Sequence, residues 1–160
     1  MHHGQADHGA HPTASMNYLH LAIMGVLSFV SMYVLMYAMV DSFANVYASI
    51  NQVYMAGLMT APMIIIELVV MGAMYANKRL NMIIIAGSAV ALVLFFMLIR
   101  QQALVYDSQF VRSMIPHHAG AILMCREATI QDAEIKALCS AIIESQQKEI
   151  DQMTAILARQ

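Results

Sequence analysis

The stretch MIPHHAGAILMC, residues 114–125, places two adjacent histidines among sulfur-containing side chains. Imidazole, thioether and thiolate groups are the ligands that Cu(I) and Ag(I) prefer. On a helix, side chains three, four or seven positions apart lie on one face. Met114 lies three positions before His117 and four before His118, and Met124 follows His117 by seven. The stretch therefore predicts a soft-metal site whose first ligands come from one helix.

Further ligands are expected from the neighbouring cysteine and from the helix that follows. Pro116 removes a backbone donor and can bend the first helix, which would re-aim both histidines. The alternative is that methionines fill gaps in a helical core and the histidines form hydrogen bonds with Glu149 or Gln146. The expected metal ligands are His117, His118, Met114, Met124, Met153, Cys125 and Glu149.

Cys125 and Cys139 lie where two facing helices could bring them together. Spacing alone does not decide between a disulfide and two small buried side chains. Both alternatives stay open at the level of the sequence.

The composition indicates a membrane protein. Of the 160 residues, 60% are hydrophobic and 11% charged, whereas soluble domains are near half apolar and about a quarter charged. The first 77 residues contain no Lys or Arg, and six of the eight basic residues lie from Arg100 onward. The net charge of −2 forms no basic patch, so we expect no nucleic-acid partner.

Three uncharged or nearly uncharged stretches are long enough to cross a bilayer as helices. They cover residues 17–40, 54–76 and 82–99, and the second contains Pro62 and Glu67. We therefore expect a transmembrane region over residues 17–100, in contact with membrane lipid. An ionisable residue such as Glu67 usually faces a bundle interior or a wet cavity, and its alternative role is a neutral acid hydrogen-bonded across helices.

The residues ahead of the first span form a His-rich flexible tail by composition, over residues 1–16. The tail can capture metal loosely, act as a solubilising terminus, or be the remnant of an expression tag. The basic inter-helix pair Lys78–Arg79 predicts a cytoplasmic loop, which places residues after Arg100 outside. We expect a multi-pass protein of a bacterial inner membrane with a periplasmic or extracytoplasmic C-terminal domain.

The C-terminal part, residues 107–160, predicts a hairpin of two amphipathic helices. Asp107 or Ser108 is expected to cap the first helix, and Asp132 the second. A lone hairpin leaves an apolar stripe in water, so we expect a homo-oligomer in which two hairpins close a four-helix bundle. Packing against the extended end of the third span is the rival arrangement. The expected inner face of the first helix holds Phe110, Met114, His117, His118, Ala121, Met124 and Cys125.

The run from Asp107 to Leu157 resembles domain-of-unknown-function family 305, in a membrane-anchored branch. The family carries an acidic residue, an aromatic residue, Met-Ile-x-His-His and Ala-Ile-x-Met, then Ile, Gln, Glu-Ile and Met on the next helix. The resemblance implies an all-α, ferritin-like bundle and, because some soluble relatives bind copper or silver, a metal-handling role. Ile156 and Cys125 depart from the family's common Trp and Ala. The matching positions are Asp107, Phe110, Met114, Ile115, His117, His118, Ala121, Ile122, Met124, Ile142, Gln146, Glu149, Ile150 and Met153.

We therefore expect a membrane-anchored copper- or silver-binding protein that serves sequestration, handover to or from a partner protein, or tolerance. No catalysis is expected, because the Glu-x-x-His pairs of a di-iron bundle are missing at Glu127 and Glu144. One alternative is a transporter lined by methionines, and another is a metal-free structural or partner-binding module. The methionines of the transporter alternative are Met32, Met36 and Met39 on the first span, and Met55, Met59 and Met63 on the second.

Overall fold

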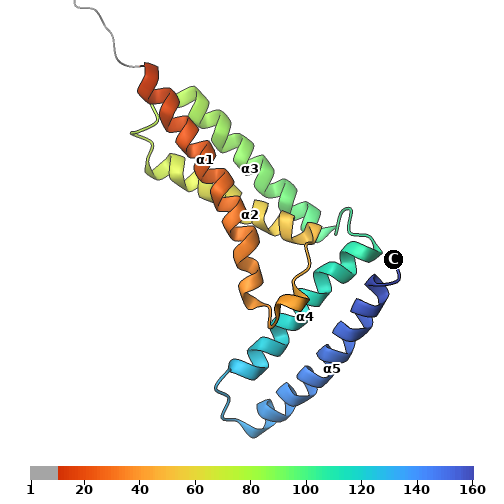
Figure 1. The fold of residues 1–160 in the computed structure, drawn as a ribbon. Helices are drawn as coiled ribbons and strands as arrows, with labels where there is room; N and C mark the ends of the chain where they lie inside the picture. Colours follow the sequence, from red (N-terminus) through yellow and green to blue (C-terminus); the bar gives the residue numbers. More distant parts are fainter. Residues whose placement is uncertain (1–10) are drawn as a thin grey trace, which may run out of the picture. The chain divides into compact units, whose positions relative to one another are not determined.

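The computed structural model describes residues 11–160, which form α-helices and short 3-10 helices and no strand (Figure 1). The predicted all-α class is confirmed. The α-helices are α1 (His11–Leu35), α2 (Ile50–Val70), α3 (Lys78–Arg100), α4 (Asp107–Glu127) and α5 (Ala133–Leu157), and the 3-10 helices are Met36–Met39 and Phe43–Asn45.

The chain divides into two compact units, here called the span unit and the hairpin unit. Within the described residues, the span unit holds 11–32 together with 56–97, and the hairpin unit holds 33–55 together with 98–160. Residues 1–10 of the expected tail lie outside the described residues. The part from His11 belongs to α1, so that helix begins before the expected residue 17.

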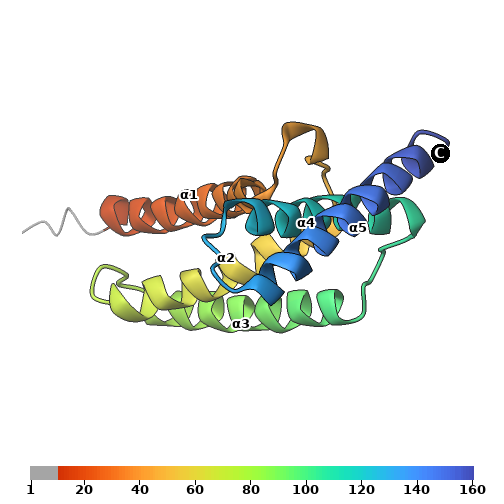
Figure 2. The ribbon, with the colours of Figure 1, turned by 90° about the horizontal axis from the view of Figure 1, so that it is seen from below.

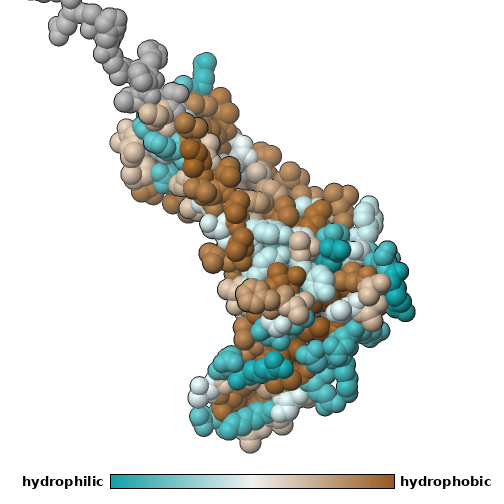
Figure 3. All heavy atoms as spheres, viewed as in Figure 1, coloured by the Kyte–Doolittle hydropathy of each residue, from teal (hydrophilic) through white to brown (hydrophobic). Residues whose placement is uncertain are grey.

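Three helices are long and apolar enough to cross a membrane, as predicted. They cover Met16–Met39, Ile50–Val70 and Lys78–Arg100. The second ends before the expected residue 76 because the backbone turns there: the Met71 amide donates to the Glu67 carbonyl at 2.8 Å, and the Met74 amide donates to the Met71 carbonyl at 2.9 Å. Figure 3 shows hydrophobic residues over much of the surface of these helices.

The interior of the span unit is small and is built where the helices approach closely. Leu21, Leu68 and Tyr75 form a buried cluster. A Cβ added at Gly57 would lie 2.5 Å from the Phe95 ring, so α2 and α3 can pack there because residue 57 has no side chain. A Cβ added at Gly87 of α3, by contrast, would meet no atom within 4 Å in the described part of the chain.

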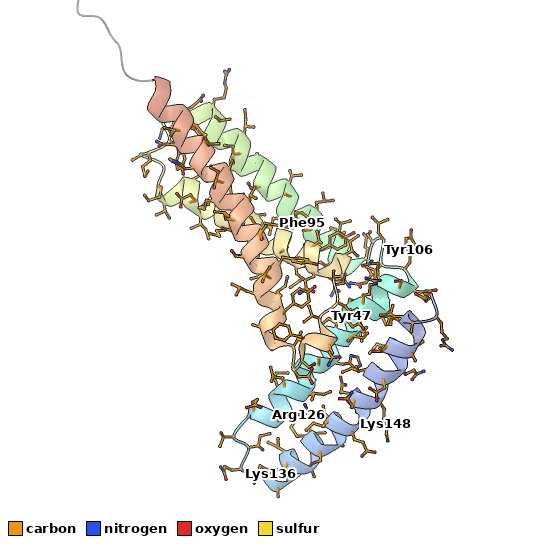
Figure 4. The ribbon with its side chains drawn as sticks, viewed as in Figure 1. Tyr47, Phe95, Tyr106, Arg126, Lys136 and Lys148 are labelled. Atoms are coloured by element: carbon orange, nitrogen blue, oxygen red, sulfur yellow. A yellow bond between two sulfur atoms is a disulfide. The ribbon has the colours of Figure 1, made fainter. Side chains whose placement is uncertain are left out.

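The hairpin unit has an aliphatic core between α4 and α5, which pack side by side (Figures 1 and 2). Ile115 and Ile122 are fully buried, and Ile150 faces them from α5. Tyr47, labelled in Figure 4, packs against the same core from the segment that follows the first span. The segment after α1 also covers α4, a contact that neither of the two expected arrangements included.

The buried face of α4 differs from the expected one. The expected arc was centred on the histidines and methionines, whereas the buried residues follow the aliphatic positions at helical spacing. Consequently Phe110, His117 and Met124 are exposed. The buried residues of α4 are Val111, Ile115, His118, Ala119, Gly120 and Ile122.

The two helix starts in the hairpin differ in their caps. Asp132 caps α5 as predicted, since its carboxylate accepts from the amides of Glu134 at 2.8 Å and Ile135 at 3.0 Å. The predicted cap of α4 at Asp107 or Ser108 is wrong, because Tyr106 occupies the capping position and its side chain makes no capping hydrogen bond. Asp107 instead lies in the first turn, where its charge favours the positive end of the helix dipole.

Candidate metal centre

His118 is the best-positioned of the expected ligands. His118 is 6% exposed and lies on the face of α4 that packs against α5. Ring atom Nδ1 lies 2.9 Å from the Met114 carbonyl oxygen, and Nε2 lies 2.6 Å from Oε2 of Glu149 on α5. Both nitrogens of the imidazole are therefore engaged, and the ring is fixed in one orientation.

The hydrogen bonds of His118 define where its protons lie. A carbonyl oxygen only accepts, so Nδ1–H donates to Met114. The other nitrogen then faces a carboxyl oxygen, and a short contact between them requires one shared proton. The pair is an imidazolium beside a carboxylate, or a neutral imidazole accepting from a carboxylic acid.

Two expected thioether ligands lie near this pair along their helices. Met114 is partly buried, one turn before His118, and its carbonyl holds the ring. Met153 is partly buried and packs against the same aliphatic core, one turn after Glu149. Of the expected ligands, the structure brings His118 and Glu149 into contact, and Met114 and Met153 each lie one helical turn from that pair along the chain.

The remaining expected ligands lie elsewhere. His117 is exposed, and its ring centroid lies 6.3 Å from that of His118. Met124 is 54% exposed. Cys125 forms a disulfide with Cys139 near the turn between α4 and α5. Of the two alternatives left open by the sequence, a disulfide or two small buried side chains, the structure has the disulfide. In this form the sulfur of Cys125 is not a thiolate.

The donor set fits a soft monovalent ion only in part. Over residues 11–160, no three His, Cys, Asp or Glu side chains come together as a metal-binding group. One imidazole and one carboxylate are in contact, so a metal ion here must take its further ligands from thioethers or from a second chain. The Glu149 side chain is 53% exposed, which leaves it free to rotate away from Nε2 and admit an ion.

Two features near this centre were missed by the sequence analysis. Arg126, labelled in Figure 4, lies 3.5 Å from the Asp41 carboxylate, which ties the end of α4 to the segment after α1. A Cβ added at Gly120 would lie 3.3 Å from the Met39 carbonyl oxygen. A glycine inside an amphipathic helix was a local signal for that close approach, whereas nothing local pairs residue 41 with residue 126.

Comparison with known proteins identifies relatives of this chain. Residues 97–157 match the family model described as "Domain of unknown function (DUF305)". The chain is 32% identical over 145 residues to "Uncharacterized protein L153" of Acanthamoeba polyphaga mimivirus, an alignment that covers 89% of this chain and 93% of that protein. No solved structure matches the chain.

Proposed function

Since the chain belongs to the family of the mimiviral protein L153 and carries a DUF305 domain, we propose that it is a membrane-anchored, non-catalytic protein that binds Cu(I) or Ag(I). The binding centre is the α4–α5 pair, and the role is sequestration, tolerance or handover to a partner protein. Its spans supply the anchor.

The observation that carries the proposal is the orientation of His118. Metal-binding histidines almost always donate their second ring N–H to a carbonyl or carboxylate, which fixes the tautomer. Nδ1 of His118 makes that bond to the Met114 carbonyl, so Nε2 is the nitrogen left to bind an ion. Binding replaces the proton shared with Glu149, and the carboxylate then balances the charge of the ion.

A second copy of the chain completes the coordination in this proposal. The side of α4 turned away from its core carries His117 and Met124, together with the exposed Phe110. On α5, Ile135 and Leu138 are 49% and 58% exposed. Two such hairpins closing a four-helix bundle would cover these side chains and bring imidazole and thioether groups from both chains together.

The disulfide supports an extracytoplasmic location for the hairpin unit. Disulfides persist in oxidising compartments and are rare in the cytosol. Cys125 and Cys139 are bonded, and the basic pair Lys78–Arg79 favours a cytoplasmic loop between α2 and α3. Both arguments favour the outer side of the membrane for α4 and α5.

The test is competition for Cu(I) between a chromogenic chelator and the full-length protein in detergent. We expect His118→Ala to remove one bound equivalent and Glu149→Gln to weaken that equivalent by about tenfold or more. Glu144→Gln is the matched control, because Glu144 is an exposed α5 carboxylate that pairs with Lys148 and not with His118. Binding by His118→Ala that equals the wild type would refute the centre.

A metal-free partner-binding module is the second candidate, and the hydrogen bonding of His118 favours it. Both ring nitrogens are satisfied within the chain, so the pair can serve as a structural link between α4 and α5. The melting temperature distinguishes the two candidates. A ligand at 100 times its Kd stabilises the fold it binds by about 2.7 kcal/mol, so Cu(I) should raise the melting temperature of a metal centre and leave that of a metal-free module unchanged.

A further inference from the structure

A second group of donor side chains surrounds a cavity in the span unit, at the end of the unit where α2 ends and α3 begins. The cavity measures about 180 Å³. It is lined by α1, by α2 near its end, and by the connection between α2 and α3. The lining residues are Asn17, His20, Leu21, Met24, Glu67, Met74 and Tyr75.

The lining combines the ligand types that a soft monovalent ion takes. His20 and Met24 lie four positions apart on α1, so they share one face of that helix. Met74 adds a second thioether from the connection, and Glu67 adds a carboxylate from α2. Imidazole and thioether are preferred by Cu(I) and Ag(I), and the carboxylate supplies the balancing charge.

Hydrogen bonds hold the walls of this cavity in place. The side-chain amide of Asn17 donates to the Met74 carbonyl at 2.8 Å, which ties the connection to α1. The side-chain amide of Asn81 on α3 donates to the Tyr75 carbonyl at 3.0 Å. The Tyr18 hydroxyl donates to the Asn81 side-chain oxygen at 2.6 Å. The backbone of the segment that carries Met74 is therefore held against two helices.

The Glu67 carboxyl lines this cavity without a Lys or Arg partner among the lining residues. None of the lining residues is Lys or Arg, and the hydroxyl of Tyr75 donates to Glu67 at 3.2 Å. A carboxylate at the end of a span is costly without a counter-charge, and a cation in the cavity supplies one.

We propose that this cavity is a second soft-metal site, which binds one Cu(I) or Ag(I) ion through His20, Met24 and Met74 beside the carboxylate of Glu67. Its ligands come from the span unit alone, so it stands independently of the α4–α5 centre. Tyr75 is a positioning residue here, because it holds the carboxylate toward the cavity through its hydroxyl.

The test uses full-length protein in detergent that carries His117→Ala and His118→Ala, so that the α4–α5 centre is removed. In this background we expect one remaining Cu(I) equivalent with sulfur neighbours in the X-ray absorption spectrum. Adding Met24→Leu and Met74→Leu should remove that equivalent, because the exchange keeps the side-chain volume and deletes both thioethers. Adding Met55→Leu and Met59→Leu is the matched control, since these methionines do not line the cavity, and should leave binding unchanged.

The outcomes separate the two sites. If the background variant binds no Cu(I), the second site is refuted while the α4–α5 proposal stands. Unchanged binding after removal of Met24 and Met74 also refutes it. Tyr75→Phe gives a finer measure: loss of the hydroxyl should weaken Cu(I) binding by about tenfold without loss of stoichiometry.

Discussion

The span unit and the hairpin unit place their apolar and polar side chains in opposite ways. In the hairpin unit, Ile115 and Ile122 are fully buried while charged residues such as Lys136 and Lys148 project from α5 (Figure 4). In the span unit, the most apolar stretch of α3 has no buried residue within the described chain, whereas the polar Asn81 is buried. The hairpin unit has the buried apolar core and exposed charges that water favours. The span unit has the apolar surface and internally satisfied polar groups that are expected of helices in lipid.

The largest expected effect tests the aliphatic core of the hairpin unit. Ile122→Ala should lower the free energy of unfolding by about 2–5 kcal/mol, because it opens a cavity in a fully buried position. Val90→Ala, at a 67% exposed position of α3, should change the free energy of unfolding by about 0.5 kcal/mol or less. Denaturant titration followed by circular dichroism measures both. Equal losses in the two variants would remove the contrast between the units.

Reduction of the disulfide is expected to come next. The bond between Cys125 and Cys139 closes a loop with a sequence separation of 14, and its loss should cost the hairpin unit about 3 kcal/mol through the entropy of the unfolded chain. Cys125→Ser with Cys139→Ser should behave as the reduced protein does, and reductant should then have no further effect. A reductant-insensitive wild type would contradict the bond.

The close approach in the span unit is tested by two glycines. Gly57→Ala places a methyl group against the Phe95 ring and should destabilise the spans by about 1–3 kcal/mol. Gly87→Ala meets no atom within 4 Å of the described chain and should be neutral or stabilising by about 0.5–1 kcal/mol. Unfolding in mixed micelles measures both changes. Opposite ranking of the two variants would show that α2 and α3 pack on another face.

The smallest effect concerns an exposed ion pair on α5. The hydrogen bond from Lys148 to Glu144, followed by its charge, lowers the pKa of the Glu144 carboxyl. Its stabilising contribution is therefore present above the unfolded pKa of about 4.3 and is lost as pH falls through the lower folded pKa. Lys148→Met should return the pKa of Glu144 toward its ordinary value in an NMR titration, and added salt should do so in part.

Much of the fold follows from local patterns in the sequence, and the rest depends on distant contacts. The spans and the cap at Asp132 are visible as apolar length and as an acid before a periodic run. The contact of His118 with Glu149 was foreseen as the alternative to a metal site, because helical spacing turns both residues toward the partner helix. His118 is buried and His117 is not because of which face of α4 packs against the rest of the hairpin unit. The packed face is the one that carries the aliphatic residues, which are more apolar than the methionines and histidines.

The cavity beside Glu67 could not be predicted from the sequence. Its donors come from three separate segments, and only Glu67 attracts notice alone, as an acid in an apolar span. His20 and Met24 share a helix face, yet nothing local assigns Met74 to that face. Hydrogen bonds between residues far apart in the chain, such as Asn17 with Met74, determine the grouping.

The covalent bond between Cys125 and Cys139 also limits how two copies of this chain can associate. Helical hairpins often dimerise by trading one helix with a neighbour, which requires the turn to open out. The disulfide beside the turn keeps α5 with its own α4 for as long as the two cysteines stay oxidised. Any pairing of this oxidised protein must therefore join two intact hairpins, surface against surface.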